Sequence, residues 1–353
     1  LVKVKNLYDF KDLSNVAMEY QIVHDETVDA SGRIEELCAE AGQETLVKIP
    51  YRLGRREPGS DYYLNLSFVY KNAVNYGPAR AEIGREQFLL PVYGVEMKEE
   101  WDSVLPDGKE TNLSSSAMEE KTADSFGYVE RKELVLKETA VQAEIFGEGF
   151  EAAFDKVTGR LIRYEAEGKS LILSGPSMNL WRAPIDNDMY KVTDWKDKYF
   201  LHRQQEQLEE FLIEKDGKEV FVKVCTHFSP LSMAFGFKVC YLWHIRRNGE
   251  LRLSLDMKGF RYSSFMPEFI PRIGIEMVLP PDMKNIVWYG LGPEENYCDM
   301  KAAALMGVYR KTVEEMHVEY AKPQENGHRE EVRWLGVGDG EKCLLICSEK
   351  GIG

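Results

Sequence analysis

The chain has 353 residues, of which 44% are hydrophobic and 29% are charged, the composition of an ordinary globular protein. Its length suggests about two domains. The formal net charge of −14 argues against binding to nucleic acid or to an anionic membrane surface, because both need clustered lysine and arginine. No apolar run approaches the ~18 residues that a membrane-spanning helix requires. These properties favour a soluble protein that acts on a neutral ligand such as a sugar.

In the first part of the chain, apolar and polar side chains alternate, which is typical of half-buried strands. Residues 16–23 form the first clear strand, and residues 62–70 carry an apolar side chain at every even position. We therefore predict that residues 1–95 form an immunoglobulin-like β-sandwich of about seven strands. Residues 96–126 are charged and rich in serine, so they are predicted to be a linker.

Residues 127–353 are predicted to form a second, larger β domain. The turn pairs Asp216-Gly217 and Asn248-Gly249 each predict a hairpin, because these residues tolerate positive φ. One helix is predicted, from Thr193 to about Phe211, where Lys, Gln, Glu and Leu are abundant. No helices alternate with strands, so the pairing is predicted to be antiparallel and the fold all-β. The strands predicted in this domain are residues 134–146, 219–226, 233–245, 251–257, 273–279 and 286–289.

The six cysteines are scattered and include no pair with the spacing of a zinc site. Four of them lie in apolar, strand-like runs, where a free cysteine behaves as a small hydrophobic residue. A disulfide framework is not expected in a chain of this length, so the sequence predicts a reducing compartment, the cytoplasm. The four in apolar runs are Cys225, Cys240, Cys343 and Cys347; the other two are Cys38 and Cys298.

The motifs of the common catalytic sites are missing from the sequence: there is no phosphate loop, zinc-protease helix or serine nucleophile elbow. The six histidines share no metal-ligand spacing, and His244 on the polar side of its strand is expected to face solvent or to be hydrogen-bonded. Neighbouring acids such as Glu294 and Glu295 point to opposite faces of an extended chain, so they cannot flank one glycosidic bond. Catalytic pairs usually join residues that are far apart in the sequence, so the residues alone nominate no catalytic pair, and we predict no metal site.

Three polar loops stand out. The first, Trp181-Arg182-Ala183-Pro184-Ile185-Asp186-Asn187-Asp188, offers oxygen ligands for a hard cation, but fewer than the six to eight that calcium takes. Hydrogen bonding of these side chains to the loop backbone is the favoured interpretation. The second loop spans residues 289–297 and the third spans residues 323–329. Such loops either line a sugar site or form buried polar networks that fix strand ends.

These three loops, in this order, resemble the C-terminal part of the long bacterial β-galactosidases of glycoside hydrolase family 2. The run from Gly149 to Leu161 is similar to the opening of the family's last domain, and residues 1–91 are similar to the sandwich domain that follows the catalytic barrel. The resemblance covers essentially the whole chain, with small departures at Leu180 and Ile185. It implies an immunoglobulin-like sandwich followed by a large antiparallel supersandwich of the galactose mutarotase type.

The resemblance implies a retaining β-galactosidase whose two catalytic glutamates, and most of its magnesium and sodium ligands, precede this chain. It places a mobile loop near the mouth of the active site, at Asp186, Asn187, Asp188, Met189 and Tyr190. Other motif residues are expected to be structural. They are Trp181, Arg182, Gly292, Pro293, Glu295, Asn296, Tyr297, Glu325, Asn326, Gly327 and Arg329.

From this we expect a chain that is inactive alone and that supports the catalytic barrel of the same polypeptide. We also expect it to shape the side of the active site that holds the galactoside aglycone, and to help form a homo-oligomer. Because the chain opens in a strand without a methionine, and the family's last substrate-stacking aromatic lies beyond it, both ends are expected to be cut. The alternatives are a carbohydrate-binding or mutarotase-like module, with His328 and Glu325 as the acid–base pair, and a purely structural pair of domains.

Overall fold

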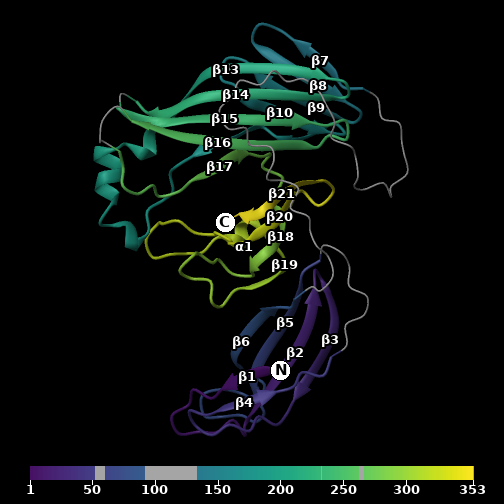
Figure 1. Ribbon diagram of the computed structural model, residues 1–353, viewed down its shortest axis with the longest axis vertical. Helices are drawn as coiled ribbons and strands as arrows, with labels where there is room; N and C mark the ends of the chain where they lie inside the picture. Colours follow the sequence, from purple (N-terminus) through teal and green to yellow (C-terminus); the bar gives the residue numbers. More distant parts are fainter. Residues whose placement is uncertain (52–59, 92–132, 232, 262–265, 353) are drawn as a thin grey trace.

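The chain folds into a small β lobe, residues 1–91, and a large β lobe that begins at residue 133 (Figure 1). The computed structural model describes residues 1–51, 60–91, 133–231, 233–261 and 266–352. The expected linker, residues 96–126, lies outside these described residues. As predicted, the fold is all-β and every strand pairing is antiparallel.

The small lobe is a sandwich of a two-stranded and a four-stranded sheet. Alternation directs Met18, Ile22 and Leu64 inward, where they pack against Val4 and Val47 of the smaller sheet. The strands predicted at residues 16–23 and 62–70 are confirmed, and the described residues of the small lobe contain six strands where about seven were expected. The sheets are β1(Val2–Lys5)–β4(Glu44–Val47) and β3(Thr27–Ile34)–β2(Val16–His24)–β5(Tyr62–Tyr70)–β6(Glu82–Leu89).

The large lobe contains four sheets. The first is β11(Lys169–Ile172)–β10(Leu161–Ala166)–β9(Phe150–Asp155)–β8(Gln142–Gly147)–β7(Val135–Glu138), and the second is β13(Gln204–Asp216)–β14(Glu219–Pro230)–β15(Phe235–Ile245)–β16(Leu251–Arg261). The third is β19(Leu305–Thr312)–β18(Asn285–Gly292)–β20(Val332–Gly338)–β21(Cys343–Ile352), and the fourth is β12(Ser174–Asn179)–β17(Gly274–Val278).

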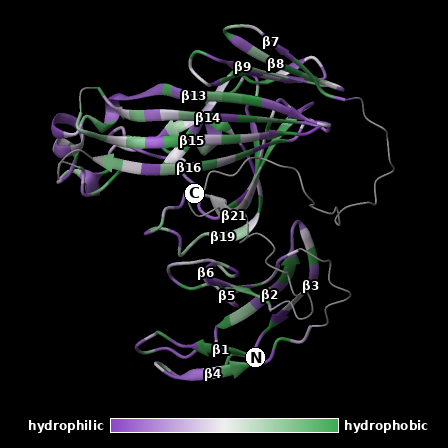
Figure 2. Cartoon of the chain, turned by 45° about the horizontal axis from the view of Figure 1, so that its top comes forward, coloured by the Kyte–Doolittle hydropathy of each residue, from purple (hydrophilic) through white to green (hydrophobic). Residues whose placement is uncertain are grey.

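The first two of these sheets pack face to face and enclose the main core (Figure 1). Val239, Tyr241 and Trp243 point inward from β15, and the ring of Trp243 meets Phe154 of β9 edge-on with 5.6 Å between centroids. Figure 2 shows the corresponding alternation of hydrophobic and hydrophilic residues along β13 to β16. The period of two in the sequence therefore reports which side chains enter this core. The hairpins predicted at Asp216-Gly217 and Asn248-Gly249 are confirmed.

The predicted helix from Thr193 to about Phe211 is wrong for most of its length. Only short helical turns form, η2(Asp194–Lys198) and η3(Leu201–Arg203), and the residues after them belong to β13. β13 pairs with β14 along its whole length, with a bulge between Leu208 and Glu210. Those backbone hydrogen bonds and the packing of Leu208 on the core outweigh a weak helical preference.

Other helical segments are short as well: η1(Asp186–Asp188) and α1(Val313–Met316). No helix in the described part of the chain is long and apolar enough to cross a membrane. The strand predicted at residues 134–146 is divided in two, β7 and β8. The Thr139 hydroxyl accepts hydrogen bonds from the backbone of Val141 and Gln142 and so forms a turn between them.

The two lobes meet through β6 and β19. The side-chain amide of Gln87 accepts from the Met306 backbone N–H at 2.7 Å and donates to the Met306 carbonyl at 2.9 Å. Beside this pair, Tyr63 of the small lobe packs with Tyr289 and Leu291 of the large lobe. Arg310 and Glu26 add an ion pair across the same junction. Amide bonds and apolar packing together therefore fix how the lobes meet.

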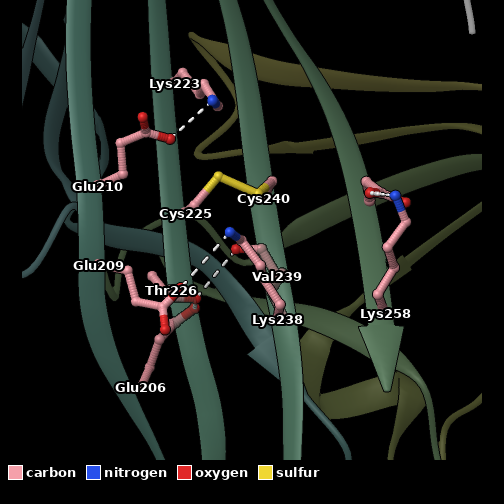
Figure 3. The surroundings of a disulfide bond; sticks show 11 residues. Glu206, Glu209, Glu210, Lys223, Cys225, Thr226, Lys238, Val239, Cys240 and Lys258 are labelled. Atoms are coloured by element: carbon pink, nitrogen blue, oxygen red, sulfur yellow. Dashed lines mark hydrogen bonds and ion pairs between the residues drawn. A yellow bond between two sulfur atoms is a disulfide. The ribbon is translucent and has the colours of Figure 1, made fainter. Parts of the chain in front are cut away.

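The expectation that all six cysteines are free is wrong for one pair. Cys225 of β14 and Cys240 of β15 form a disulfide, with Cα atoms 4.1 Å apart (Figure 3). The two residues are directly opposite each other in the antiparallel register, so their side chains leave the sheet on the same face. Cys343 and Cys347, expected as small buried hydrophobes, are exposed on β21.

The disulfide predicts a difference in thiol count and stability. In air-oxidised protein, alkylation should label four cysteines before reduction and six after it. Replacing Cys225 by alanine should lower the free energy of unfolding by about 2–3 kcal/mol, the entropic value for a loop of this length. Mass spectrometry and urea denaturation measure the two effects, with exposed Cys38→Ala as the matched control. Six labelled thiols in the unreduced protein would contradict the bond.

Candidate functional site

The first of the three loops is held by a bidentate ion pair. Arg182 donates to both carboxylate oxygens of Asp188, at 2.7 and 2.9 Å, and its Nε donates to the Pro271 carbonyl at 2.9 Å. The other role of the Asp188 carboxylate is to accept from the Ile185 backbone N–H at 2.9 Å. Asp188 is buried, so each of its contacts faces inward. The pair closes the loop upon itself and ties it to the segment before β17.

Around this closed base, the other residues of the loop face outward. Asp186 and Asn187 are exposed, and Met189 and Tyr190 have 63% and 93% of their surface exposed. Of the five residues expected near substrate, Asp188 alone is turned away from solvent. The loop therefore presents an amide, a carboxylate, a thioether and a phenol from one rigid base.

The base of the loop also rests on an aromatic cluster. Trp195 and Tyr199 are buried with Leu201 and Phe235, and Trp181 packs against this group. The indole N–H of Trp195 donates to the Phe269 carbonyl at 3.0 Å. This cluster fixes the path of the chain on both sides of the exposed residues.

The second and third loops are joined by Glu295. One carboxylate oxygen of Glu295 accepts from the Gly327 backbone N–H at 2.9 Å, and the other accepts from the Tyr320 hydroxyl. The Gly327 backbone has a φ of +79°, a conformation that glycine adopts without strain. The acid that sequence reasoning placed in a family motif thus bridges two loops.

Asn296 and Arg329 complete this bridge from buried positions. Asn296 accepts from the Glu330 backbone N–H at 2.8 Å and donates to the Glu294 carbonyl at 3.0 Å. Arg329 donates to the carbonyls of Pro293, Gly327 and His328, and its guanidinium lies 5.1 Å from the centroid of the Trp288 ring. Burial lowers the pKa of Arg329, yet the three carbonyls accept from its cationic form.

Arg272 connects the third loop to the first. It forms an ion pair with Glu325, while the preceding residue, Pro271, accepts from Arg182. The first and third loops, which are more than 100 residues apart in the sequence, are therefore joined through one short segment. The neighbouring Asn326 donates to the Val318 carbonyl at 3.3 Å.

The acid–base pair considered for a mutarotase-like module is not assembled. Glu325 is engaged by Arg272, whereas His328 stacks on Tyr297, with 5.0 Å between ring centroids, and lies 3.2 Å from Glu330. Burial also raises the pKa of the Tyr297 hydroxyl to about 12, so it stays protonated. Each group has its own partner, and nothing directs His328 and Glu325 onto one sugar atom.

His244 also has a partner, since it lies 2.6 Å from Glu219 and stacks on Phe221. His244 was expected either to face solvent or to be hydrogen-bonded, and the structure shows the hydrogen bond. Four contributing residues were not predicted from the sequence. They are Pro271 and Arg272, which connect two loops, Trp195, which lies under the first loop, and Glu330, whose carboxylate lies beside His328. These residues belong to none of the three motifs, and the sequence carries no signal that singles them out.

Two family descriptions match the chain: "Beta galactosidase small chain" over residues 146–349, and "Beta-galactosidase, domain 4" over residues 2–91. A β-galactosidase of Priestia megaterium is 28% identical over 295 residues, which are 82% of this chain and 25% of that protein. A β-galactosidase of Vibrio vulnificus (strain CMCP6) is 26% identical over 351 residues, 96% of this chain and 31% of that protein. For a β-galactosidase of Lactococcus lactis the identity is 31% over 193 residues, 52% of this chain and 19% of that protein.

This chain thus spans between a fifth and a third of the length of these relatives. Both matched regions fall on described lobes, the first on the large lobe and the second on the small one. Because the first match covers more than half of the chain, the chain belongs to the β-galactosidase family and carries two domains from the C-terminal part of that enzyme.

Proposed function

We propose that this chain is the non-catalytic C-terminal part of a retaining β-galactosidase of glycoside hydrolase family 2, which hydrolyses terminal β-D-galactosides such as lactose. Its large lobe would be a supersandwich of the galactose mutarotase type. The observation that carries the proposal is the first loop, which projects exposed polar and aromatic groups from a base fixed by Arg182 and Asp188. A rigid projecting loop of this kind is suited to contact a ligand held by a neighbouring domain.

Within the parent enzyme, the loop would form the aglycone side of the active site, while the catalytic carboxylates belong to an upstream barrel. Magnesium and sodium, which the family resemblance implies, would be bound by residues of that upstream part. Among the described residues, no three His, Cys, Asp or Glu side chains are grouped so that they could hold a metal ion.

The parent protein would be cytoplasmic. Glutathione and thioredoxin keep most thiols reduced there, so Cys225 and Cys240 would be a dithiol in the cell and a disulfide after purification in air. Alkylation of protein directly in the cell lysate measures this difference. If Cys225 and Cys240 are not alkylated in a fresh lysate, they are already disulfide-bonded in the cell, which would point to an oxidising compartment instead.

A homo-oligomer interface is proposed on the outer face of the sheet β13–β16. Leu212 and Leu242 lie on either side of Lys223 in the strand register, and both are nearly half exposed, as is the neighbouring Phe221. Exposed apolar groups that gather in this way commonly mark an association surface.

The interface predicts a change of mass in solution. Leu242→Glu places a charge in the apolar group and should shift the assembled enzyme to a smaller species, without loss of folding. Light scattering on a sizing column measures the mass, and Leu46→Glu, at an exposed leucine of β4 in the small lobe, is the control. An unchanged mass for Leu242→Glu would place the interface elsewhere.

The supporting role predicts activity only upon mixing. This chain alone should not hydrolyse a chromogenic β-galactoside, because both catalytic carboxylates would be absent. Mixing it with the separately expressed upstream part should produce hydrolysis, and the upstream part alone is the control. Hydrolysis by the chain alone would overturn the proposal. An absence of hydrolysis by the mixture would contradict the supporting role.

The loop predicts a specific kinetic defect. Tyr190→Ala in the mixed enzyme should raise KM for a galactoside with an aromatic aglycone by about three- to tenfold, with kcat little changed, because an aromatic contact contributes about 0.5–1.5 kcal/mol to binding. Val157→Ala, at an exposed apolar position between β9 and β10, is the control. Identical KM values for both variants would exclude a role of Tyr190 in binding.

A further inference from the structure

At one end of the small lobe, the segment 8–16 and the segment 70–76 enclose a hollow of about 430 Å³. Small-molecule sites have volumes of about 300–1,000 Å³, so the hollow is large enough for a sugar. Val16 and Tyr70 pair at this end of β2 and β5, whereas Val23 and Tyr63 pair at the end that meets the large lobe. The hollow is therefore remote from the three loops of the large lobe.

Aromatic rings form much of the wall. Phe10 and Tyr76 stand at its rim with 95% and 66% of their surface exposed, and Tyr8 and Tyr70 lie deeper. The negative face of an aromatic ring attracts polarised C–H bonds, such as those on one face of a sugar ring. Two exposed rings at a polar rim thus provide stacking surfaces that are already in place.

The hydroxyls of the wall lie in a row. The Tyr8 and Tyr70 hydroxyl oxygens are 3.2 Å apart, and Lys11 donates to the Tyr76 hydroxyl at 3.0 Å. Hydrogen bonds from its neighbours raise the pKa of Tyr70, so that this group remains a neutral donor and acceptor. An apolar ligand would leave these groups without water or a replacement partner, which is costly.

The charges of the wall disfavour ionic ligands. Lys11, Asp12 and Glu40 are the charged side chains that line the hollow, and their formal charges sum to −1, which disfavours a phosphate or another anion. A cationic ligand would meet the Lys11 ammonium, which already lies 5.2 Å from the centroid of the Tyr76 ring. What remains is a neutral ligand with many hydroxyls.

The wall is also built to hold its shape. The buried Asn6 side chain donates to the carbonyls of Lys11 and Ala39, at 2.7 and 3.1 Å, and accepts from the Tyr8 backbone N–H at 2.9 Å. On the other side, Asn15 accepts from the Asn72 backbone N–H at 3.0 Å. Such fixed walls reduce the entropy lost when a ligand is bound.

We propose that this hollow binds a neutral saccharide, by stacking on Phe10 and Tyr76 and by hydrogen bonding to the tyrosine hydroxyls. It is a second sugar site, separate from the loop at Asp186–Tyr190, and it goes beyond the proposed supporting role. It would hold a mono- or disaccharide on the surface of the small lobe.

Saturation-transfer NMR and calorimetric titration of this chain with galactose, lactose and maltose test the proposal. We expect millimolar binding of at least one of these sugars, weakened about three- to tenfold by Phe10→Ala and by Tyr76→Ala. Both side chains are exposed, so their removal should not prevent folding. Tyr76→Phe, which keeps the ring, should weaken binding less than Tyr76→Ala.

Phe88→Ala, an exposed aromatic of β6 outside the hollow, is the matched control and should bind as the unchanged chain does. No binding of any of the three sugars would overturn the proposal. Loss of binding in Tyr190→Ala with retention in Phe10→Ala would overturn it too, by placing the site on the large lobe. The titration needs no upstream part, so a failure of the mixed enzyme to hydrolyse galactosides would leave its result intact.

Discussion

The bidentate ion pair between Arg182 and Asp188 is the contact on which the arrangement of the three loops depends. It closes the first loop, and the remaining Nε–H of the same guanidinium reaches the Pro271 carbonyl. Arg272 then continues the connection to Glu325. Removing one partner of a buried pair costs about 3–5 kcal/mol, because the other charge is left without compensation. The exposed residues of the loop therefore keep their positions without needing contacts of their own.

Much of the fold could be predicted from the sequence because strands bury one face. The alternation of apolar and polar residues predicts that Val239, Tyr241 and Trp243 face the core, where Phe154 lies. Asn248-Gly249 predicts the turn that follows. The failure at residues 193–211 has the opposite cause. A stretch rich in Gln and Glu has a slight helical preference, and only its pairing with β14, which local composition does not encode, makes it a strand. The cysteine pair escaped notice in the same way, since residues 231–234 join the two strands and no two-residue turn fixes their register.

The candidate site could be predicted in part. Its motif residues, such as Asp188, Glu295 and Arg329, were found because polar side chains gather in unusual loops. What each one contacts could not be predicted. Asp188 ends η1 and Tyr190 follows it by two residues, yet Asp188 is buried and Tyr190 is almost fully exposed. Arg272 belongs to no motif at all, and only the packing of the whole lobe brings it to Glu325.

The hollow belongs to the small lobe and the loop at Asp186–Tyr190 to the large lobe, and the packed strands β2 and β5 run from the hollow to the lobe junction. Between the hollow and the lobe junction, Val16 and Val23 of β2 are seven residue steps apart, or about 23 Å at the usual rise of a strand. Two side chains along it, Met18 and Ile22, are fully buried and lie opposite Phe68 and Leu64 of β5 in the strand register. Coupling between distant sites requires an element with two alternative arrangements, and a packed strand pair of this kind offers only one. A ligand in the hollow would therefore add affinity for sugar at the surface without altering the loop at Asp186–Tyr190. In a larger enzyme, that independence would let the small lobe raise the local concentration of a saccharide while the catalytic geometry stays unchanged.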